Sequence, residues 1–197
     1  ERDVTMLKQC AYEMLKSTGH EEISLSSLSS SDYSQLPELI NYLIASRERG
    51  VNISLPSLRI DAFSLEVMNK VQDIRKSSLT FAPEAGSQRL RNVINKGLTE
   101  EIILNGAGLA FEGGWQKVKL YFMLGLPTET QEDMKEIPRL ADKIARRYYE
   151  IPKEKRNGKC QITISTSFFA PKPFTPLQWA PMYKKDKYLA RARIVNE

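Results

Sequence analysis

Residues able to ligate a soft metal ion are scarce in this sequence. The 197 residues include two cysteines, Cys10 and Cys160, and a single histidine, His20. This inventory is too small for a conventional Cys/His zinc site or for a three-cysteine iron–sulfur site built from this chain alone. Cys10 falls among apolar residues of an expected helix, which favours a packed thiol over a reactive one.

Hydroxyl groups are concentrated in one stretch, SSLSSSDYS, which runs on from an expected strand over residues 22–28. Seven serines fall between residues 24 and 34. Serine hydroxyls and the backbone amides of a loop can hydrogen-bond a small polar molecule. The same composition suits an ordinary surface turn. A ligand loop and a turn therefore remain as alternatives.

The stretch KVKLYFMLGLPTET, residues 117–130, predicts a strand, a tight turn and a helix start. The β-branched, aromatic and long apolar residues of its first half indicate a buried strand. Gly125 to Pro127 end the extended pattern, and Thr128 or Thr130 offers an N-cap for a helix beginning near residue 131. In an α/β protein such a turn lies at the carboxyl end of a strand, where parallel sheets and barrels place their ligands.

Helical and extended patterns alternate along the rest of the chain, which predicts an α/β fold with a mainly parallel sheet. Five strands are too few for a complete eight-stranded barrel, and no glycine-rich nucleotide motif follows any of them. The expected strands cover residues 22–28, 51–55, 78–82, 117–124 and 161–169, and the expected helices cover residues 3–18, 35–49, 65–74, 86–97, 99–112, 131–149 and a basic segment from residue 184.

Composition predicts one globular domain over residues 1–197, with 41% hydrophobic and 27% charged residues. No apolar run approaches the length of a membrane span and no signal-peptide pattern opens the chain, so we expect a cytoplasmic protein that does not contact a membrane. The net charge is +5, with basic clusters at 146–147, 153–159 and 184–193. A solvated surface is the simpler interpretation of these clusters, and an RNA-binding surface is the alternative.

Several motifs together resemble the radical S-adenosylmethionine (radical SAM) superfamily. They are SLSSLSSSDY, SLRID, FAPEAGSQRLRNVINKG, YFMLGLPTET and FFAPKPFTPLQW, in that order and spacing, and they extend over nearly the whole chain. The resemblance is closest to uncharacterised radical SAM proteins that follow a cobalamin-binding domain, and more distant to methylthiotransferases. Each motif alone is weak, but the combination is specific.

The resemblance implies a partial (β/α)6 TIM-type barrel of parallel strands. In that family the first strand leads into a C-x-x-x-C-x-x-C loop whose thiolates hold a [4Fe–4S] cluster, and the cluster binds S-adenosylmethionine (SAM). Cys10 and Cys160 do not form this motif. We therefore expect the chain to lack the first strand and the cluster loop, to hold strands two to six, and to be inactive by itself.

The resemblance also assigns residues to SAM. It places Ser26 and Ser27 at the methionyl amino group, although both serines can equally cap a loop. It places Glu84 and Ser87 at the ribose or the methionyl group, and a carboxylate suits ribose because it accepts two hydrogen bonds. Ser87 can instead cap the helix that follows.

For Arg89 the resemblance implies a contact with a carboxylate through two parallel N–H bonds, and the alternative is a solvated helix face. Arg91 has the same two alternatives. The resemblance places Gly125, Leu126 and Pro127 beside adenine, whereas a plain chain reversal is the other interpretation. The remaining candidates are Arg59 and Asp61, as ligands or a surface pair, Glu129, as a ligand or a helix-end charge, Pro171, Lys172 and Pro173, near substrate, and Trp179, in core or inter-domain packing.

The activity implied for the parent enzyme is reductive cleavage of SAM by the cluster, which gives a 5′-deoxyadenosyl radical. An upstream cobalamin-binding domain would make methyl transfer to an unactivated carbon plausible. The catalytic residues and the substrate stay unassigned. The competing hypothesis is a non-catalytic barrel fragment that binds a partner such as RNA through its basic segments.

Overall fold

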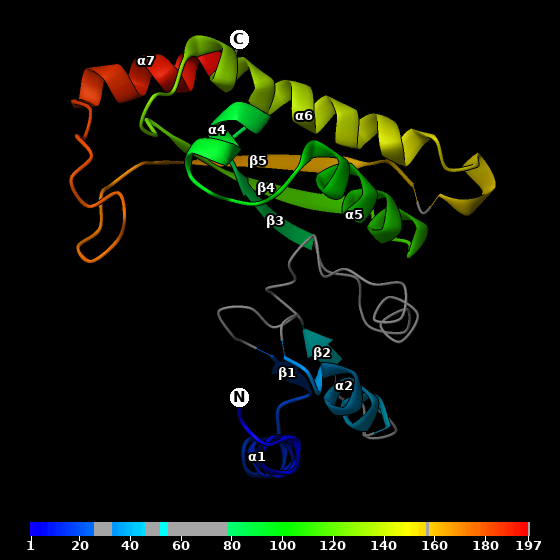
Figure 1. Cartoon of the computed structure of the whole chain (residues 1–197). Helices are drawn as coiled ribbons and strands as arrows, with labels where there is room; N and C mark the ends of the chain where they lie inside the picture. Colours follow the sequence, from blue (N-terminus) through cyan, green and yellow to red (C-terminus); the bar gives the residue numbers. More distant parts are fainter. Residues whose placement is uncertain (26–32, 46–51, 55–78, 157, 197) are drawn as a thin grey trace.

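The computed structural model describes residues 1–25, 33–45, 52–54, 79–156 and 158–196 (Figure 1). Within these ranges the chain alternates helices with strands, and every strand pair is parallel. The α/β class with parallel strands, predicted from the alternating patterns, is therefore confirmed. The predicted helix over 65–74 lies outside the described residues.

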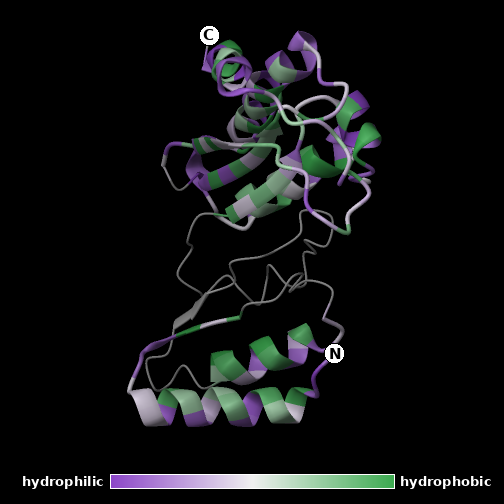
Figure 2. Ribbon diagram, turned by 90° about the vertical axis from the view of Figure 1, so that its left-hand side faces the viewer, coloured by the Kyte–Doolittle hydropathy of each residue, from purple (hydrophilic) through white to green (hydrophobic). Residues whose placement is uncertain are grey.

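The first part of the chain pairs two helices with a small sheet. Helix α1 (Val4–Thr18) begins at Asp3, whose side chain accepts the amides of Thr5 and Met6, and it ends at Gly19. Strand β1 (Glu22–Ser24) pairs with β2 (Asn52–Ser54), and α2 (Leu36–Ala45) lies between them in sequence. Along α1 and α2 hydrophobic residues interleave with hydrophilic ones, as expected of helices that bury one side (Figure 2).

The second part holds a three-stranded sheet in the order β3, β4, β5. Its strands are β3 (Leu79–Glu84), β4 (Lys117–Leu124) and β5 (Gln161–Phe168). The connecting and flanking helices are α4 (Gln88–Val93), α5 (Glu100–Glu112), α6 (Gln131–Tyr149), the short 3-10 turn η3 (Lys153–Lys155) and α7 (Lys185–Asn196).

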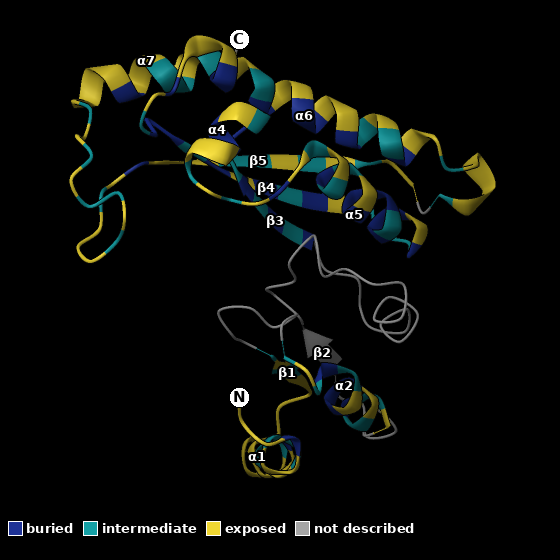
Figure 3. Ribbon diagram, viewed as in Figure 1, coloured by how far each residue is buried: buried dark blue, intermediate teal, exposed yellow. Residues whose placement is uncertain are grey.

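Most of the main core lies between one face of this sheet and helices α5 and α6, and residues of α1 and α2 make up the rest (Figure 3). Strand β4 alternates as its sequence predicts, with Val118, Leu120, Phe122 and Leu124 buried. These side chains pack with apolar residues of α5 and α6, including Ile144. The buried side of β4 therefore fixes which side of the sheet the helices cover, and leaves the other side to polar residues.

Pro138 lies at an exposed position inside α6, and the helix continues through it. Two details differ from the sequence-based expectation. The five strands form two sheets among the described residues, not one. Finally, β1 stops at Ser24, short of the predicted end of that strand. In the described part of the chain, no helix is long and apolar enough to cross a membrane.

Candidate functional site

The carboxyl ends of β3 and β4 carry two loops that approach each other closely. In the first loop, Gly86 lies against the backbone of α6, where a Cβ would come within 2.4 Å of the Ile137 nitrogen. In the second loop, Thr130 is the N-cap of α6 and forms a reciprocal capping box with Asp133. A side chain at residue 86 would push the loop after β3 away from α6, so this position requires glycine.

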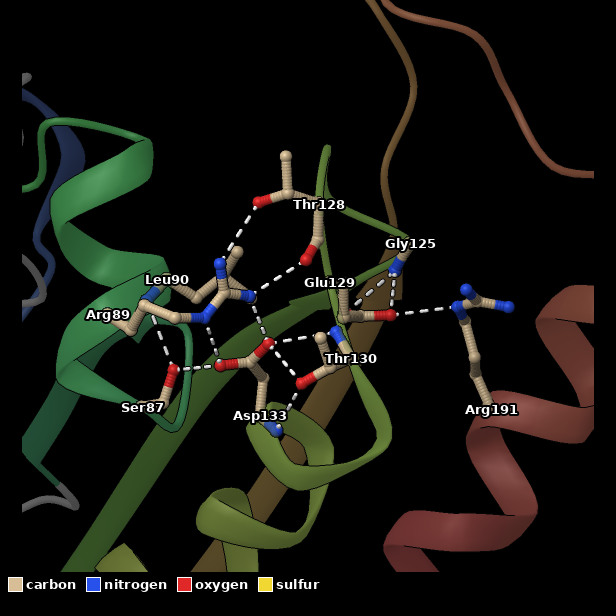
Figure 4. A network of polar contacts seen from close by, with 9 residues as sticks. All are labelled: Ser87, Arg89, Leu90, Gly125, Thr128, Glu129, Thr130, Asp133 and Arg191. Atoms are coloured by element: carbon tan, nitrogen blue, oxygen red, sulfur yellow. Dashed lines mark hydrogen bonds and ion pairs between the residues drawn. The ribbon is translucent and has the colours of Figure 1, made fainter.

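Asp133 is the centre of a polar network that joins these loops (Figure 4). Its carboxylate accepts hydrogen bonds from Ser87 Oγ, from Arg89 Nε at 3.2 Å and Nη2, from the Thr130 amide at 2.8 Å and from Thr130 Oγ1 at 2.7 Å. Burial opposes ionisation of this carboxyl, but the bonds from Arg89, Ser87 and Thr130 prevail and hold its pKa well below the usual value.

Arg89 extends the network to the β4–α6 turn. Its Nη1 donates to Thr128 Oγ1 at 3.3 Å and its Nη2 donates to the Thr128 carbonyl at 2.8 Å. Ser87 meanwhile caps α4 by accepting the Leu90 amide at 3.1 Å. One arginine and one aspartate thus tie the loop after β3 to the loop after β4.

A second ion pair fixes the turn from its other side. Both carboxylate oxygens of Glu129 accept the Gly125 amide, at 3.0 and 2.9 Å, and one of them also accepts Arg191 Nε at 2.8 Å. The Glu129 side chain is only 2% exposed. Burial raises the pKa of Glu129 above its ordinary value, although the Gly125 amide and Arg191 act in the opposite direction. The turn is therefore held by a charge that depends on α7.

Helix α7 also closes over the turn sterically. Gly125 has a φ of 86°, and a Cβ there would lie 2.4 Å from Tyr188 Cε1. The Tyr188 hydroxyl donates to the Phe169 carbonyl at 2.6 Å, and its ring stacks on Phe168. Arg191 lies over the Tyr183 ring, 3.9 Å from its centroid. Glycine at 125 is required both by the backbone conformation and by the docked helix.

Backbone strain gathers at the same edge of the sheet. Three residues near the ends of the strands have a positive φ. They are Glu84 at the end of β3 (66°), Thr128 after β4 (65°) and Phe174 after β5 (62°). Such a conformation costs energy for a residue with a Cβ, and it persists where the surroundings or a ligand require it. Glu84 is half-buried and pairs with Lys96 at 3.3 Å. The strained carboxylate at the end of β3 is the strongest ligand candidate among the described residues.

The side of the sheet that faces away from α5 and α6 is polar. Lys119 and Tyr121 of β4 are in register with Thr163 and Ser165 of β5, and all four are exposed or half-buried. The Lys119 ammonium lies 4.7 Å from the Tyr121 ring centroid. This face offers hydroxyl groups and a cation beside the candidate site.

The structure clarifies several predicted site residues and corrects others. Leu126 is fully buried with Ala85, Leu90 and Phe169, so this residue of the turn is anchored by its side chain. Arg91 was expected on a solvated face or at a ligand, but it is completely buried because its guanidinium donates to the carbonyls of Ala85, Gly86 and Leu98. Pro127 is half-buried, Pro171 is half-buried, Lys172 and Pro173 are exposed, and Ser26, Ser27, Arg59 and Asp61 lie outside the described residues.

For Trp179 the core-packing alternative is wrong, because this side chain is 88% exposed, and inter-domain packing stays a prediction. Sequence reasoning also missed Asp133 and Arg191 as site residues. The T-x-x-D spacing from Thr130 to Asp133 is a capping-box pattern and gave a local signal. Arg191 lies 62 residues from its partner Glu129, and no local pattern indicates that pairing.

The residues of this chain can be compared with the two cofactors expected from the motifs, a [4Fe–4S] cluster and SAM. A [4Fe–4S] cluster of the expected kind needs three thiolates, whereas the whole chain has two cysteines, so its own residues do not fit the cluster. No group of three or more His, Cys, Asp or Glu residues suited to a metal ion occurs in the described ranges. For SAM the fit is better, since a half-buried carboxylate and an anchored turn lie at the carboxyl edge of adjacent strands.

Comparisons with known proteins show the fold and the family of this chain. An uncharacterized protein of Methanocaldococcus jannaschii is 37% identical over 195 residues, which are 97% of this chain and 40% of that relative. Coproporphyrinogen III oxidase (HemN) from Escherichia coli, a radical SAM enzyme, has the same fold at a TM-score of 0.59 and 15% identity, over 88% of this chain and 38% of the enzyme. The likeness confirms a TIM-type barrel fold, of which the described strands form part.

The chain thus spans well under half of each of these two proteins. The sequence model of the radical SAM superfamily matches residues 1–141, which include β3, β4 and the loops that carry the Asp133 network. The family suggested by the motifs is confirmed, and the chain belongs to the radical SAM superfamily.

Proposed function

We propose that the carboxyl edge of β3, β4 and β5 binds SAM, and that this edge is part of the active site of a radical SAM enzyme. The observation that carries the proposal is Glu84, a strained and half-buried carboxylate at the end of β3. Carboxylate oxygens accept hydrogen bonds from adjacent ribose hydroxyls. Family membership makes SAM the expected ligand.

The Gly125–Pro127 turn suits adenine because its backbone is held from several sides. The Gly125 amide is bound by Glu129, and Leu126 is buried in a small apolar cluster. A backbone fixed before the ligand arrives loses little conformational entropy on binding. We assign the turn to adenine on this ground.

For Arg89 the structure narrows the proposal. Four of its five N–H donors already reach Asp133 and Thr128, among the described residues. In this arrangement one N–H donor of Arg89 remains, which is too few for a bidentate contact with the SAM carboxylate. We propose that Arg89 offers at most a single hydrogen bond to the ligand, while Ser87 acts through Asp133 and through the α4 cap.

Isothermal titration calorimetry of the 197-residue chain with SAM tests the proposal. We expect saturable one-to-one binding, weakened about 10-fold by Glu84→Gln because a charge-assisted hydrogen bond is lost. Glu101→Gln is the matched control, since Glu101 is an exposed carboxylate on α5. Lys96→Met removes the Glu84–Lys96 pair but keeps Glu84. It therefore shows whether an effect of Glu84→Gln comes from the ligand contact or from the loss of that pair. No binding, or equal affinity in Glu84→Gln, would contradict the proposal.

The reaction of the whole protein is a further proposal. In this family the bound cofactors supply a 5′-deoxyadenosyl radical, and methyl transfer assisted by an upstream cobalamin-binding domain is the reaction that we propose for the parent. This chain contributes the SAM edge and the polar sheet face around Lys119 and Ser165 to such a site. Its two cysteines do not supply the cluster ligands.

A further inference from the structure

A loop of residues 170–184, here called the aromatic loop, presents large apolar side chains to solvent. Phe174 is 98% exposed, Trp179 is 88% exposed and Met182 is 56% exposed. Aromatic side chains bury more apolar area than any others when they pack, so full exposure of two in one loop is unusual. This loop leads from β5 to α7 at the carboxyl edge of the sheet (Figure 1).

The exposure does not result from a lack of structure in the loop. Thr175 Oγ1 donates to the Lys172 carbonyl at 2.7 Å, and the Gln178 side chain accepts the Phe174 amide at 3.2 Å. Leu177 packs against the small cluster of Ala85, Leu90, Leu126 and Phe169. The inward side of the loop is thus anchored next to the proposed SAM edge, and its outward side holds the two aromatic rings.

The cations around this loop differ from those on α6. Lys135, Arg139, Lys143 and Arg146 of α6 each pair with a nearby carboxylate. Lys172, Lys184, Lys185 and Lys187 are exposed, and they make no ion pair among the residues that the structure describes.

Two of these lysines, Lys185 and Lys187, lie in the first turn of α7, where the helix dipole disfavours positive charge. The exposed carboxylate of Asp186 lies between them, so residues 170–188 carry four lysines and one acidic residue, an excess of positive charge that an anion can neutralise.

We propose that the aromatic loop binds single-stranded nucleic acid. Unpaired bases stack on Trp179 and Phe174, and the four lysines hold the phosphates, which is the combination that binds single strands without strong sequence preference. Charge complementarity favours this partner over an apolar protein surface, which would leave the lysines without counter-charges. The proposal does not depend on SAM binding.

The two tryptophans make the test selective. Trp115 is 5% exposed and Trp179 is 88% exposed, so a ligand that stacks on the loop quenches the fluorescence of Trp179 and leaves that of Trp115. The probe is a 12-nucleotide oligouridylate. We expect saturable quenching, and a binding constant that falls with salt with a log–log slope of about −2 to −3, because each phosphate neutralised contributes roughly −0.7.

Variants separate stacking from general attraction by charge. Measured by the anisotropy of a labelled 12-mer, Trp179→Leu should weaken binding about 10-fold or more, whereas Trp179→Phe should retain most of it. Replacing Lys184 and Lys185 by alanine should weaken binding and flatten the salt slope. Lys143→Ala is the matched control, since Lys143 is exposed but paired with Glu100.

Three results would overturn the proposal. The first is no binding of the 12-mer by the wild-type chain at low salt. The second is equal binding by Trp179→Leu and wild type. The third is a wild-type chain that self-associates in sedimentation velocity, becomes monomeric in Trp179→Leu, and binds no RNA in either form, because the loop would then be a protein interface.

Discussion

Asp133 illustrates how one side chain joins two loops that are distant in sequence. Its carboxylate is 4% exposed and accepts hydrogen bonds from Ser87, Arg89 and Thr130. Removing it leaves a guanidinium and two hydroxyl groups without their acceptor, which costs more than the loss of one surface ion pair. The spacing of the loops at the proposed SAM edge therefore depends on a residue that need not touch the ligand.

Asp133→Asn should lower the free energy of unfolding by about 2 kcal/mol near neutral pH, because charge-assisted bonds become neutral ones. The pKa of Asp133 lies below its ordinary value of 3.8, so its contribution is complete above about pH 4 and declines as the pH falls further. Urea denaturation between pH 2 and pH 7 should show the variant and wild type converging in acid. A constant difference across this range would contradict the assignment, and Asp142→Asn on the surface of α6 is the control.

The backbone at Thr128 is strained, and a substitution can relieve this strain without disrupting a strand or a helix. A β-branched residue with a φ of 65° is a conformational outlier. Thr128→Gly should stabilise the chain by about 1 kcal/mol, less the weak contact with Arg89. The stability of Thr128→Asn should fall between that of wild type and that of Thr128→Gly, since Asn tolerates the left-handed region. Thermal denaturation ranks the stabilities of wild type and the two variants. Destabilisation by both substitutions would contradict backbone strain at Thr128.

At the scale of elements, α7 contacts the β4–α6 turn through the Glu129–Arg191 ion pair as well as through the packing of Tyr188. Glu129 is buried and needs Arg191, its charged partner from α7. Breaking such a pair leaves an uncompensated buried carboxylate, while replacing both partners costs less. The position of the Gly125–Pro127 turn should therefore depend on whether α7 is docked.

Arg191→Leu should destabilise the chain by about 3 kcal/mol, and Glu129→Gln combined with Arg191→Leu should recover part of this loss. In Arg191→Leu the pKa of Glu129 rises further above its ordinary value of 4.5. The loss of stability caused by Arg191→Leu should therefore grow as the pH rises above 4.5. Urea denaturation at pH 5 and pH 8 measures both effects. Equal stability of Arg191→Leu and the exposed control Arg139→Leu would contradict a stabilising role of the Glu129–Arg191 pair.

Local signals predicted these elements well, whereas long-range partners stayed hidden. Thr99 caps α5, and Thr130 caps α6, as their sequence context indicates. Ser87 and Asp133 are 46 residues apart, and Glu129 and Arg191 are 62 apart. Helix caps depend on neighbouring residues and can be predicted from them, but pairings across the fold depend on how the elements pack.

For the whole molecule, the alternation of helical and extended patterns predicted the parallel α/β architecture because each amphipathic element needs a partner layer. The size of Trp179 suggested core or inter-domain packing, and its exposure makes the core alternative wrong. Its neighbours Leu177 and Ala180 take the buried side of the loop, and this leaves the ring outside. Which residue of a proline-rich loop turns inward is decided by the loop's conformation, and hydrophobicity alone does not indicate it.

For the whole 197-residue chain we expect no cluster assembly. Anaerobic incubation with iron and sulfide should yield no stable [4Fe–4S] absorption band, since Cys10 and Cys160 provide too few thiolates. Visible absorption after desalting, with an iron determination, measures this. A stoichiometric cluster would contradict the ligand count, and loss of absorption in Cys160→Ser would identify the ligand involved.

Hydrogen exchange of the 197-residue chain with and without SAM tests the central claim most directly, because it locates the ligand. We expect saturable protection of residues 84–89 and 125–130, the two loops joined by Asp133, and none in α1. Protection of these two loops would place SAM at the carboxyl edge of β3 and β4. Saturable SAM binding with protection elsewhere, and none in these loops, would contradict the account.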